Sequence, residues 1–408
     1  MAGLLKEAGH TVTIATVKLY REKVESIGCK FIPLRPNIDE IGPEGDWAKK
    51  VNDSRHGAEF VARELIVPYI EENYETIMSA TEDCDLLISH VLTFVTPIVA
   101  EKRGIPWLTV MLQPATLLSA YDPPAFAFAV NLPKLKFLGP VFFKFLFKVF
   151  AAFSYHWFKP VYELRKIADV PNPYSNPMMK YFSPFGTLAM FPSSFAEPQK
   201  DWPVNTFQIG FPLYADADSV ISDKVSEFLK QGKAPIVFTL GTAVVEMKSD
   251  FFHIAYEAVK QTKVRAIFLI GDNSDHSTDE MSYDEHICIS GYESYPLLFP
   301  ECKAIVHQCG IGTTSQALYS GKQQILIPFA HDQPDNALRV KKLGCGVIVY
   351  AKQLSVEKLV KAINEIDSER KYSDNAAKYR SELLENDFEG KFMDAINKVL
   401  NKQLVVSS

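Results

Sequence analysis

One stretch of the sequence, Ala304–Phe329, constrains the fold more than any other. It holds a short apolar run, a glycine-containing segment, a helical pattern that ends at Gly321, and a second apolar run that ends at Pro328. This order predicts a strand, a loop, a helix and a second strand, as in a parallel β-α-β unit. Glycine allows close approach of backbone to a ligand, and a helix begins with unpaired N–H groups and partial positive charge. The unit therefore suits a phosphate, although a βα turn that needs glycine only for its geometry has the same pattern.

The residues that follow this unit make the pattern more specific. The segment VHQCGIGTTSQAL, at 306–318, is followed by IPFAHDQPDNALRVKKLGCG, at 327–346. Together they resemble the donor-binding signature of family 1 glycosyltransferases, which use nucleotide sugars. The resemblance is greatest to bacterial enzymes similar to sterol glucosyltransferases and to lipid or flavonoid rhamnosyltransferases. It extends to FPSSFAEPQKDWPVNTFQIGFPL and IVFTLGTAV, and so covers nearly the whole chain.

The resemblance implies an α/β fold of the GT-B type, with two Rossmann-like domains that face each other across a cleft. We expect an acceptor-binding domain over 1–206, a donor-binding domain over 207–385, and a segment, 386–408, whose helix packs back on the first domain. The residues support parallel sheets independently, because apolar runs such as Asp85–His90 and Trp107–Met111 alternate with helical patterns.

The resemblance assigns eleven residues to donor binding. They are Gly241, Thr242, Tyr292, His307, Gln308, Gly310, Gly312, Thr313, Thr314, Asp332 and Gln333. The glycines and threonines would contact the diphosphate, the tyrosine would stack on uracil or thymine, and the acid–amide pair would hold the sugar hydroxyls. From the residues alone, the threonine at 242 fits equally well as an ordinary helix N-cap.

Three positions modify this picture. Gln308 stands where many relatives have a histidine, so a neutral amide would donate to the phosphate. Tyr292 is followed by Glu293 rather than by the usual proline, which leaves the base contacts open. Asp335 and Asn336 are interpreted as caps of the following helix, in which a proline suits the first turn.

The start of the chain has the pattern of a helix that ends at Gly9, followed by a strand at His10–Thr16. In the family this is the second half of the first β-α-β unit, so about 15–20 residues are expected upstream of Met1. The resemblance places the catalytic base, a His or Asp, in that upstream loop, and His10 is interpreted as structural. His90, at a strand end, is either an ordinary buried histidine or a residue that assists the base or lines the acceptor pocket.

Residues 137–158, FLGPVFFKFLFKVFAAFSYHWF, are unusually aromatic and include Lys144 and Lys148. The lysines interrupt the apolar run, so it does not have the pattern of a membrane span. Three interpretations remain: a pair of core helices, a wall of an apolar acceptor pocket, or a peripheral membrane contact in which the lysines face anionic lipid.

Composition excludes several classes of function. The net charge is −6 and there is no basic stripe, so no nucleic-acid partner is expected. The six cysteines form no Cys-x-x-Cys pair, so we expect neither a zinc site nor a disulfide framework. No carboxylate pair suggests a magnesium clamp, so neither a metal nor a cofactor is expected. The first ten residues lack a long apolar core, and we expect a cytoplasmic protein, with peripheral membrane association as an alternative.

The sequence therefore predicts an inverting glycosyltransferase. It would move a hexose or deoxyhexose from a UDP- or dTDP-sugar to a hydroxyl of a small lipophilic acceptor such as a flavonoid, a sterol or a hydroxy-lipid. The alternative is a catalytically incomplete fragment or pseudoenzyme that binds nucleotide sugars. A nucleotide-sugar epimerase is a third interpretation, but it would leave the aromatic segment at 137–158 without a role.

Overall fold

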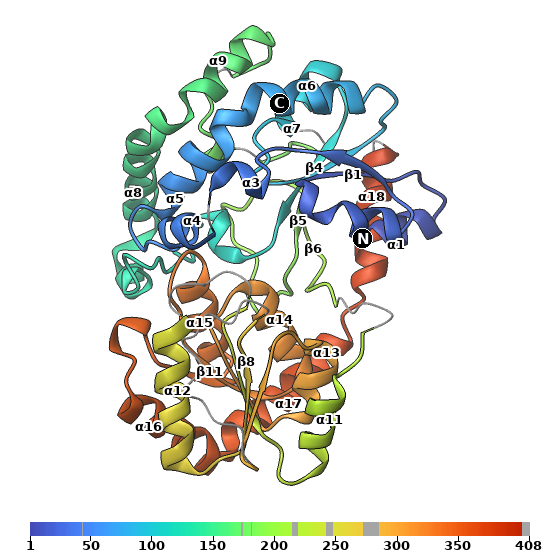
Figure 1. Ribbon diagram of the computed structural model, residues 1–408. Coiled ribbons are helices and arrows are strands. Elements are labelled where there is room, and N and C mark those ends of the chain that lie inside the picture. Colours follow the sequence, from blue (N-terminus) through green and yellow to red (C-terminus); the bar gives the residue numbers. More distant parts are fainter. Residues whose placement is uncertain are drawn as a thin grey trace.

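The computed structural model describes residues 1–401 except 43, 173, 181, 214–218, 242–247 and 272–284. It forms two α/β domains, which Figure 1 shows one above the other, with the chain's last helix returning from the second domain to the first. Both domains are built on parallel strands. The two-domain α/β fold expected from the sequence is confirmed.

The second domain holds a parallel sheet of six strands in the order β12-β11-β10-β7-β8-β9. The strands are β7 (Ile236–Thr239), β8 (Ala266–Leu269), β9 (Ile287–Ser290), β10 (Ala304–His307), β11 (Gln323–Leu326) and β12 (Gly346–Ile348). The chain builds outward from β7 to β9 and then returns to build outward from β10 on the other side. The direction of winding thus reverses between β7 and β10, and open α/β sheets bind ligands beyond the carboxyl ends of strands at such a point.

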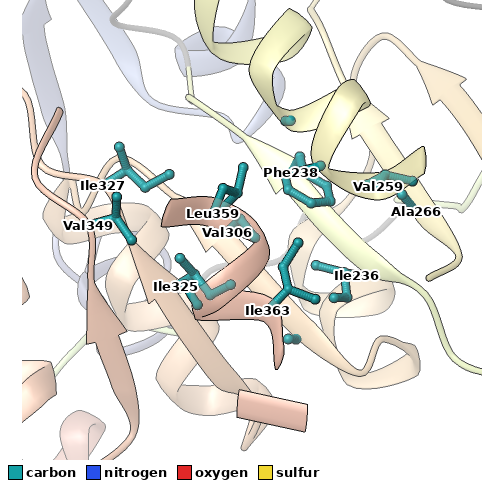
Figure 2. Close-up of a cluster of buried hydrophobic side chains, with 14 of the residues drawn as sticks. Ile236, Phe238, Val259, Ala266, Val306, Ile325, Ile327, Val349, Leu359 and Ile363 are labelled. Atoms are coloured by element: carbon teal, nitrogen blue, oxygen red, sulfur yellow. The ribbon is translucent and has the colours of Figure 1, made fainter. Parts of the chain in front are cut away.

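Helices cover both faces of this sheet. They are α11 (Asp223–Lys230), α12 (Lys248–Thr262), α13 (Tyr295–Leu298), α14 (Ile311–Ser320), α15 (Gln333–Lys342), α16 (Val356–Ser368) and α17 (Arg370–Leu384). Successive side chains of a strand point to opposite faces of the sheet, so alternate residues pack on the same face. Ile236 and Phe238 pack with α12 and α16 in the cluster of Figure 2, whereas Val237 packs with α11 and α13. Helix α17 was not predicted from the sequence.

The strands of the first domain form two parallel sheets. One pairs β1 (Thr13–Thr16) with β2 (Lys30–Pro33), and the other has the order β3-β4-β5-β6. The latter strands are β3 (Leu87–His90), β4 (Trp107–Met111), β5 (Thr187–Ala189) and β6 (Thr206–Gln208). Because β6 belongs to this sheet, the first domain extends through Gln208, slightly beyond the predicted limit at 206.

The helices of the first domain are shorter and less regular. They are α1 (Ala2–Glu7), α2 (Arg21–Ser26), α3 (Ile38–Ile41), α4 (Glu44–Val51), α5 (Gly57–Phe60), α6 (Ile70–Ala80), α7 (Thr96–Arg103), α8 (Gly139–Ser154), α9 (Lys159–Ile167) and α10 (Pro177–Lys180). One long helix was expected over 58–76, but a π-helical turn at Val61–Ile66 and a 3₁₀ turn at Val67–Tyr69 separate α5 from α6. Pro68 lacks the N–H that an uninterrupted α-helix needs there.

Two apolar contacts join the domains. Helix α18 (Phe388–Leu400) buries Phe392 and Ile396 against Leu108 and Leu188 of the first domain. A second cluster combines residues of both domains, among them Phe191 of the first and Tyr379 of the second. Among the described residues, the two domains therefore share apolar cores.

Candidate functional site

The loop after β10 presents the start of helix α14 to open space. Gly310 is the N-cap and has no side chain to satisfy the first helical N–H groups. A methyl group at Gly312, in the first turn, would meet no atom of the described residues within 4 Å. Such a helix start attracts an anion, because its N–H groups and the helix dipole both favour negative charge.

The loop after β7 lies directly against this helix start. A Cβ at Gly241 would lie 2.4 Å from Gln308 Nε2 and 3.6 Å from Thr313 Oγ1. Gly241 also has φ of +63°, a conformation that favours glycine. The structure thus brings together Gly241, Gln308, Gly310, Gly312 and Thr313, at the point where the direction of winding reverses. Thr242 lies outside the described residues.

His307 and Cys309 fix the conformation of the glycine loop. Cys309 is a buried non-glycine residue with φ of +70°, and its N–H donates to Nδ1 of His307 at 3.1 Å. The other ring nitrogen of His307 lies 2.9 Å from Gln324 Oε1. Burial lowers the pKa of His307 to about 4. His307 was predicted to contact the donor, but both ring nitrogens are engaged inside the core, so it positions the loop instead.

Several buried polar atoms near the loop have no hydrogen-bond partner among the described residues. They are Oε1 of Gln308, Oγ1 of Thr314 and Oδ1 of Asn336. Each residue is less than one-tenth exposed. A buried polar atom without a partner is unfavourable by about 1–3 kcal/mol, so three of them around one loop indicate a place where a polar ligand binds.

Asp332, which precedes helix α15, is tied to the glycine loop through Asn336. The amide of Asn336 donates to Asp332 Oδ2 at 2.6 Å and to the carbonyl of Cys309 at 3.0 Å. The N–H of Ile311 also hydrogen-bonds the Asp332 carboxyl. Burial of the carboxyl group outweighs these bonds and raises the pKa of Asp332 to about 6. The residue keeps an exposed edge, so it can still accept a hydroxyl donor.

Gln333 holds the turn before α15. Its Oε1 accepts from the N–H groups of Phe329 at 2.8 Å and Ala330 at 3.0 Å. The amide oxygen is therefore committed, and any contact with a sugar falls to Nε2. The interpretation of Asp335 and Asn336 as helix caps is wrong. Asp332 is the N-cap, so both residues lie inside the helix and their side chains reach neighbouring loops.

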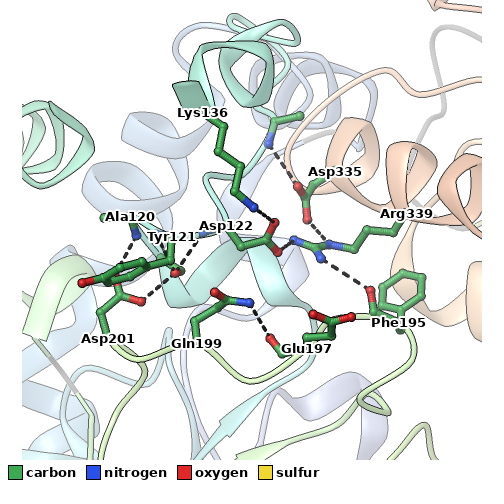
Figure 3. A network of polar contacts seen from close by, with 12 residues as sticks. Ala120, Tyr121, Asp122, Lys136, Phe195, Glu197, Gln199, Asp201, Asp335 and Arg339 are labelled. Carbon is green, nitrogen blue, oxygen red and sulfur yellow. Dashed lines mark hydrogen bonds and ion pairs between the residues drawn. The ribbon is translucent and has the colours of Figure 1, made fainter. Parts of the chain in front are cut away.

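An ionic network that the sequence did not suggest joins the domains beside this site (Figure 3). Arg339 pairs with Asp335 at 2.7 Å, on its own helix, and with Asp122 of the first domain at 2.9 Å. Asp335 also accepts the N–H of Ala125 at 3.1 Å. The i,i+4 spacing of Asp335 and Arg339 is visible in the sequence, but it indicates only an ion pair on the surface of one helix and not a contact between domains. The partners from the first domain are more than two hundred residues away in sequence.

The remaining predicted residues lie at strand ends. Tyr292 follows β9, is largely exposed, and has its ring centroid 6.3 Å from that of Tyr295. Its role in stacking on a base remains a prediction. His90 ends β3, where its Nδ1 accepts the N–H of Leu92 at 3.4 Å. Burial lowers the pKa of His90, which keeps the imidazole neutral at pH 7.

Known proteins are similar to this chain in sequence and in fold. Residues 272–389 match the family model for the C-terminal domain of erythromycin biosynthesis protein CIII-like proteins. A sterol 3-beta-glucosyltransferase of Debaryomyces hansenii is 28% identical over 93% of this chain and 24% of its own length. An O-mycaminosyltylonolide 6-deoxyallosyltransferase of Streptomyces fradiae is 25% identical over 83% of this chain and 79% of its own length. The chain spans less than a third of the first sterol glucosyltransferases that it matches.

Solved structures agree on the fold. A calicheamicin glycosyltransferase superposes with a TM-score of 0.71 at 17% identity and covers 99% of this chain and 94% of its own. The glycosyltransferase VinC, solved with dTDP, gives a TM-score of 0.67 at 16% identity over 98% of this chain and 94% of its own. The chain is thus similar in sequence to known glycosyltransferases over most of its length, and it has the GT-B fold of the solved glycosyltransferases.

Proposed function

We propose that this protein is an inverting glycosyltransferase. It moves a hexose or deoxyhexose from a UDP- or dTDP-sugar to a hydroxyl group of a small lipophilic acceptor. The observation that carries the proposal is the meeting of Gly241, Gln308 and the start of α14 beside Asp332, with buried polar atoms that lack partners. The relatives support the transfer class, because their names describe transfer of glucose or a deoxy sugar.

In the proposed mechanism each part of the site has its own task. As the sugar leaves, negative charge grows on the diphosphate, and the N–H groups of the first turn of α14 stabilise it. The hydroxyl of Thr313 and the amide of Gln308 lie beside that turn and add neutral donors. The carboxylate of Asp332 accepts sugar hydroxyls and so orients the anomeric carbon for attack.

The acceptor hydroxyl must lose its proton to a base as it attacks. Within the described residues, His90 is the candidate that the sequence named, and burial keeps its imidazole neutral at pH 7. His90→Gln tests this role. A loss of kcat with unchanged donor affinity assigns His90 to proton transfer, and an unchanged kcat removes it from the mechanism.

Calorimetric titration with UDP, dTDP and the corresponding sugars tests donor binding. We expect micromolar to millimolar binding of at least one nucleotide, which is the usual range for a substrate. Asp332→Asn should weaken binding of the nucleotide sugar much more than binding of the free nucleotide, because only the sugar reaches this side chain. If neither UDP nor dTDP binds to the folded protein, the proposal is wrong.

A product assay separates transfer from binding alone. The protein is incubated with the donor that binds and with flavonoids, sterols and hydroxy-lipids, and products are identified by mass spectrometry. A glycosylated acceptor supports the transferase. Tight donor binding without transfer to any acceptor supports the alternative, a catalytically incomplete nucleotide-sugar binder.

A further inference from the structure

Helix α8 presents one apolar face to the core and another to solvent. Phe143 and Phe147 are buried and pack with Ala120. On the opposite side, Val141, Phe145, Val149 and Phe153 recur every four residues and are 80%, 66%, 49% and 63% exposed. We call these four residues the outer stripe. Residues spaced by four lie along one side of a helix, so the outer stripe is a continuous apolar ridge.

The exposed residues just before α8 extend this ridge. Phe137 is 79% exposed and Leu138 is 45% exposed, and both immediately precede the helix. Large apolar side chains gathered in this number on one surface mark a site of interaction rather than ordinary scatter.

The segment that carries the outer stripe has charged side chains of a single sign, although Lys136 and Lys159 pair with Asp122 and Glu163 at its two ends. Between Asp122 and Glu163 the sequence holds five lysines and no Asp or Glu, although the whole chain has a net charge of −6. The lysines are Lys134, Lys136, Lys144, Lys148 and Lys159. All five are exposed, and Lys134 and Lys148 have no acidic partner among the described residues. The partner of this surface must therefore be both apolar and negatively charged.

We propose that the outer stripe of α8 docks the protein on an anionic lipid bilayer. The helix lies in the plane of the interface, with Phe145 and Phe153 among the acyl chains and Lys144 and Lys148 near the headgroups. Aromatic and aliphatic side chains provide the apolar contact, and each lysine adds electrostatic attraction to anionic lipid.

The segment lies on the membrane rather than across it. Contrary to the expectation from the sequence, residues Leu132–Ile167 are long and apolar enough to span a bilayer by length and composition alone. However, Phe143, Trp157 and Phe158 within them are buried in the core of the first domain. A transmembrane arrangement would remove these side chains from that core, whereas an interfacial one leaves the fold intact.

A second copy of the chain is a poorer occupant. An isologous contact across α8 would bring the lysines of one copy toward the lysines of the other, and no acidic side chain in the segment would balance them. Anionic lipid instead complements both the apolar ridge and the positive charge.

The docking surface lies close to a contact between the domains. The ammonium group of Lys144 lies 5.5 Å from the ring centroid of Tyr121, and the next residue, Asp122, pairs with Arg339 of the second domain. A docked protein thus holds the ionic network of Arg339 near the bilayer. Docking itself does not depend on sugar transfer.

Vesicle flotation tests the proposal with the full chain. Vesicles of phosphatidylcholine are compared with vesicles that contain about 30% phosphatidylglycerol, at low and high salt. We expect binding to the anionic vesicles that salt weakens. Val141→Ser/Phe145→Ser should lower the partition coefficient roughly tenfold or more, because each change removes apolar contact. The matched control, Leu213→Ser/Val220→Ser, removes two exposed apolar side chains of the second domain and should bind as the wild type does.

A second pair of variants tests the charge. Lys144→Glu/Lys148→Glu should abolish the preference for anionic vesicles, whereas Lys358→Glu/Lys361→Glu on α16 should retain it. Nucleotide binding, measured on the same proteins, shows that the variants are folded and keeps this test separate from that of the proposed function. Equal binding by all variants, or no binding by the wild type, overturns the proposal. A dimer that Val141→Ser/Phe145→Ser converts to a monomer, without vesicle binding, identifies a second copy as the occupant instead.

Discussion

Gly241 and Gln308 are packed so closely that any side chain at position 241 would displace the amide group of Gln308. A Cβ at Gly241 would lie 2.4 Å from Gln308 Nε2, although the two residues belong to loops after different strands. The contact holds the loop after β7 against the start of α14. The two sides of the proposed diphosphate site are therefore mutually dependent.

Gly241→Ala should displace Gln308 and lower nucleotide affinity roughly tenfold or more, which corresponds to about 1.4 kcal/mol. Gly104→Ala is the control, because Gly104 also has a positive φ, +69°, but a Cβ there meets nothing within 4 Å. Both variants should lose about 1 kcal/mol of unfolding free energy from backbone strain. Calorimetry should show that only the former loses nucleotide binding, and equal affinities would contradict this account.

Gly312→Ala should separate folding from binding. A methyl group at Gly312 would meet no atom within 4 Å in the part of the chain that the structure describes, and alanine favours a helix over glycine by about 1 kcal/mol. We expect an equal or higher melting temperature together with weaker nucleotide binding, because the methyl group occupies the space beside the helix start. Unchanged binding would show that the diphosphate lies elsewhere.

His307 should make stability fall on acidification. Its pKa is about 4 in the folded protein and 6.5 without burial, so the unfolded chain takes up a proton first as pH falls below 6.5. The wild type therefore loses stability between pH 6.5 and 4 through this group. His307→Gln removes that contribution. Urea unfolding at several pH values should show the variant less dependent on pH in this window, and parallel curves would refute the assignment.

Asp332 should act in the opposite direction. Its folded pKa of about 6 lies above the ordinary 3.8, so the unfolded chain loses its proton first as pH rises. Stability from this group therefore falls between about pH 4 and 6 and stays lower above. Asp332→Asn should be more stable than the wild type at pH 7, with the difference shrinking toward pH 4. If the variant and the wild type have the same melting temperature at pH 7 as well as at pH 4, this prediction is wrong.

Arg339 should contribute strongly to stability. Arg339→Met leaves the buried carboxylate of Asp335 without its cation, and such a loss costs about 3–5 kcal/mol. Asp335→Asn/Arg339→Met should recover part of it, because the amide can still accept the N–H of Ala125. Asp122→Asn should cost about 1 kcal/mol or less, since Asp122 is more exposed. Denaturant unfolding measures all three, and a neutral Arg339→Met would exclude the network as an interdomain tie.

The structural features that were predicted correctly depend on residues that are close to one another in the sequence. The β-α-β unit around Gly310 followed from apolar periodicity and glycine placement. Roles that depend on distant partners were missed. His307 had the sequence context of a ligand contact, but Gln324 on the adjacent strand engages its ring. Asp335 had the sequence context of a helix cap, but its carboxylate accepts a hydrogen bond from the N–H of Ala125 in the first domain.

The segment at 137–158 shows a further limit. Its composition could not tell a core helix from a surface helix, because both faces of α8 are apolar. The structure separates them: Phe143 and Phe147 face the core, while the outer stripe faces solvent. The first of the three interpretations, a pair of core helices, is therefore right for one face of α8 and wrong for the other.

Helix α15 begins with Gln333, directly after Asp332. About two turns further along the helix, Arg339 forms an ion pair with Asp122 of the first domain. One helix thus connects the residue proposed to hold the sugar, Asp332, with the loop at 119–126 of the first domain. Replacement of that loop would therefore also remove contacts that fix the position of helix α15. Under the proposed function, an engineer could not change the first domain at this loop without affecting how the sugar is held.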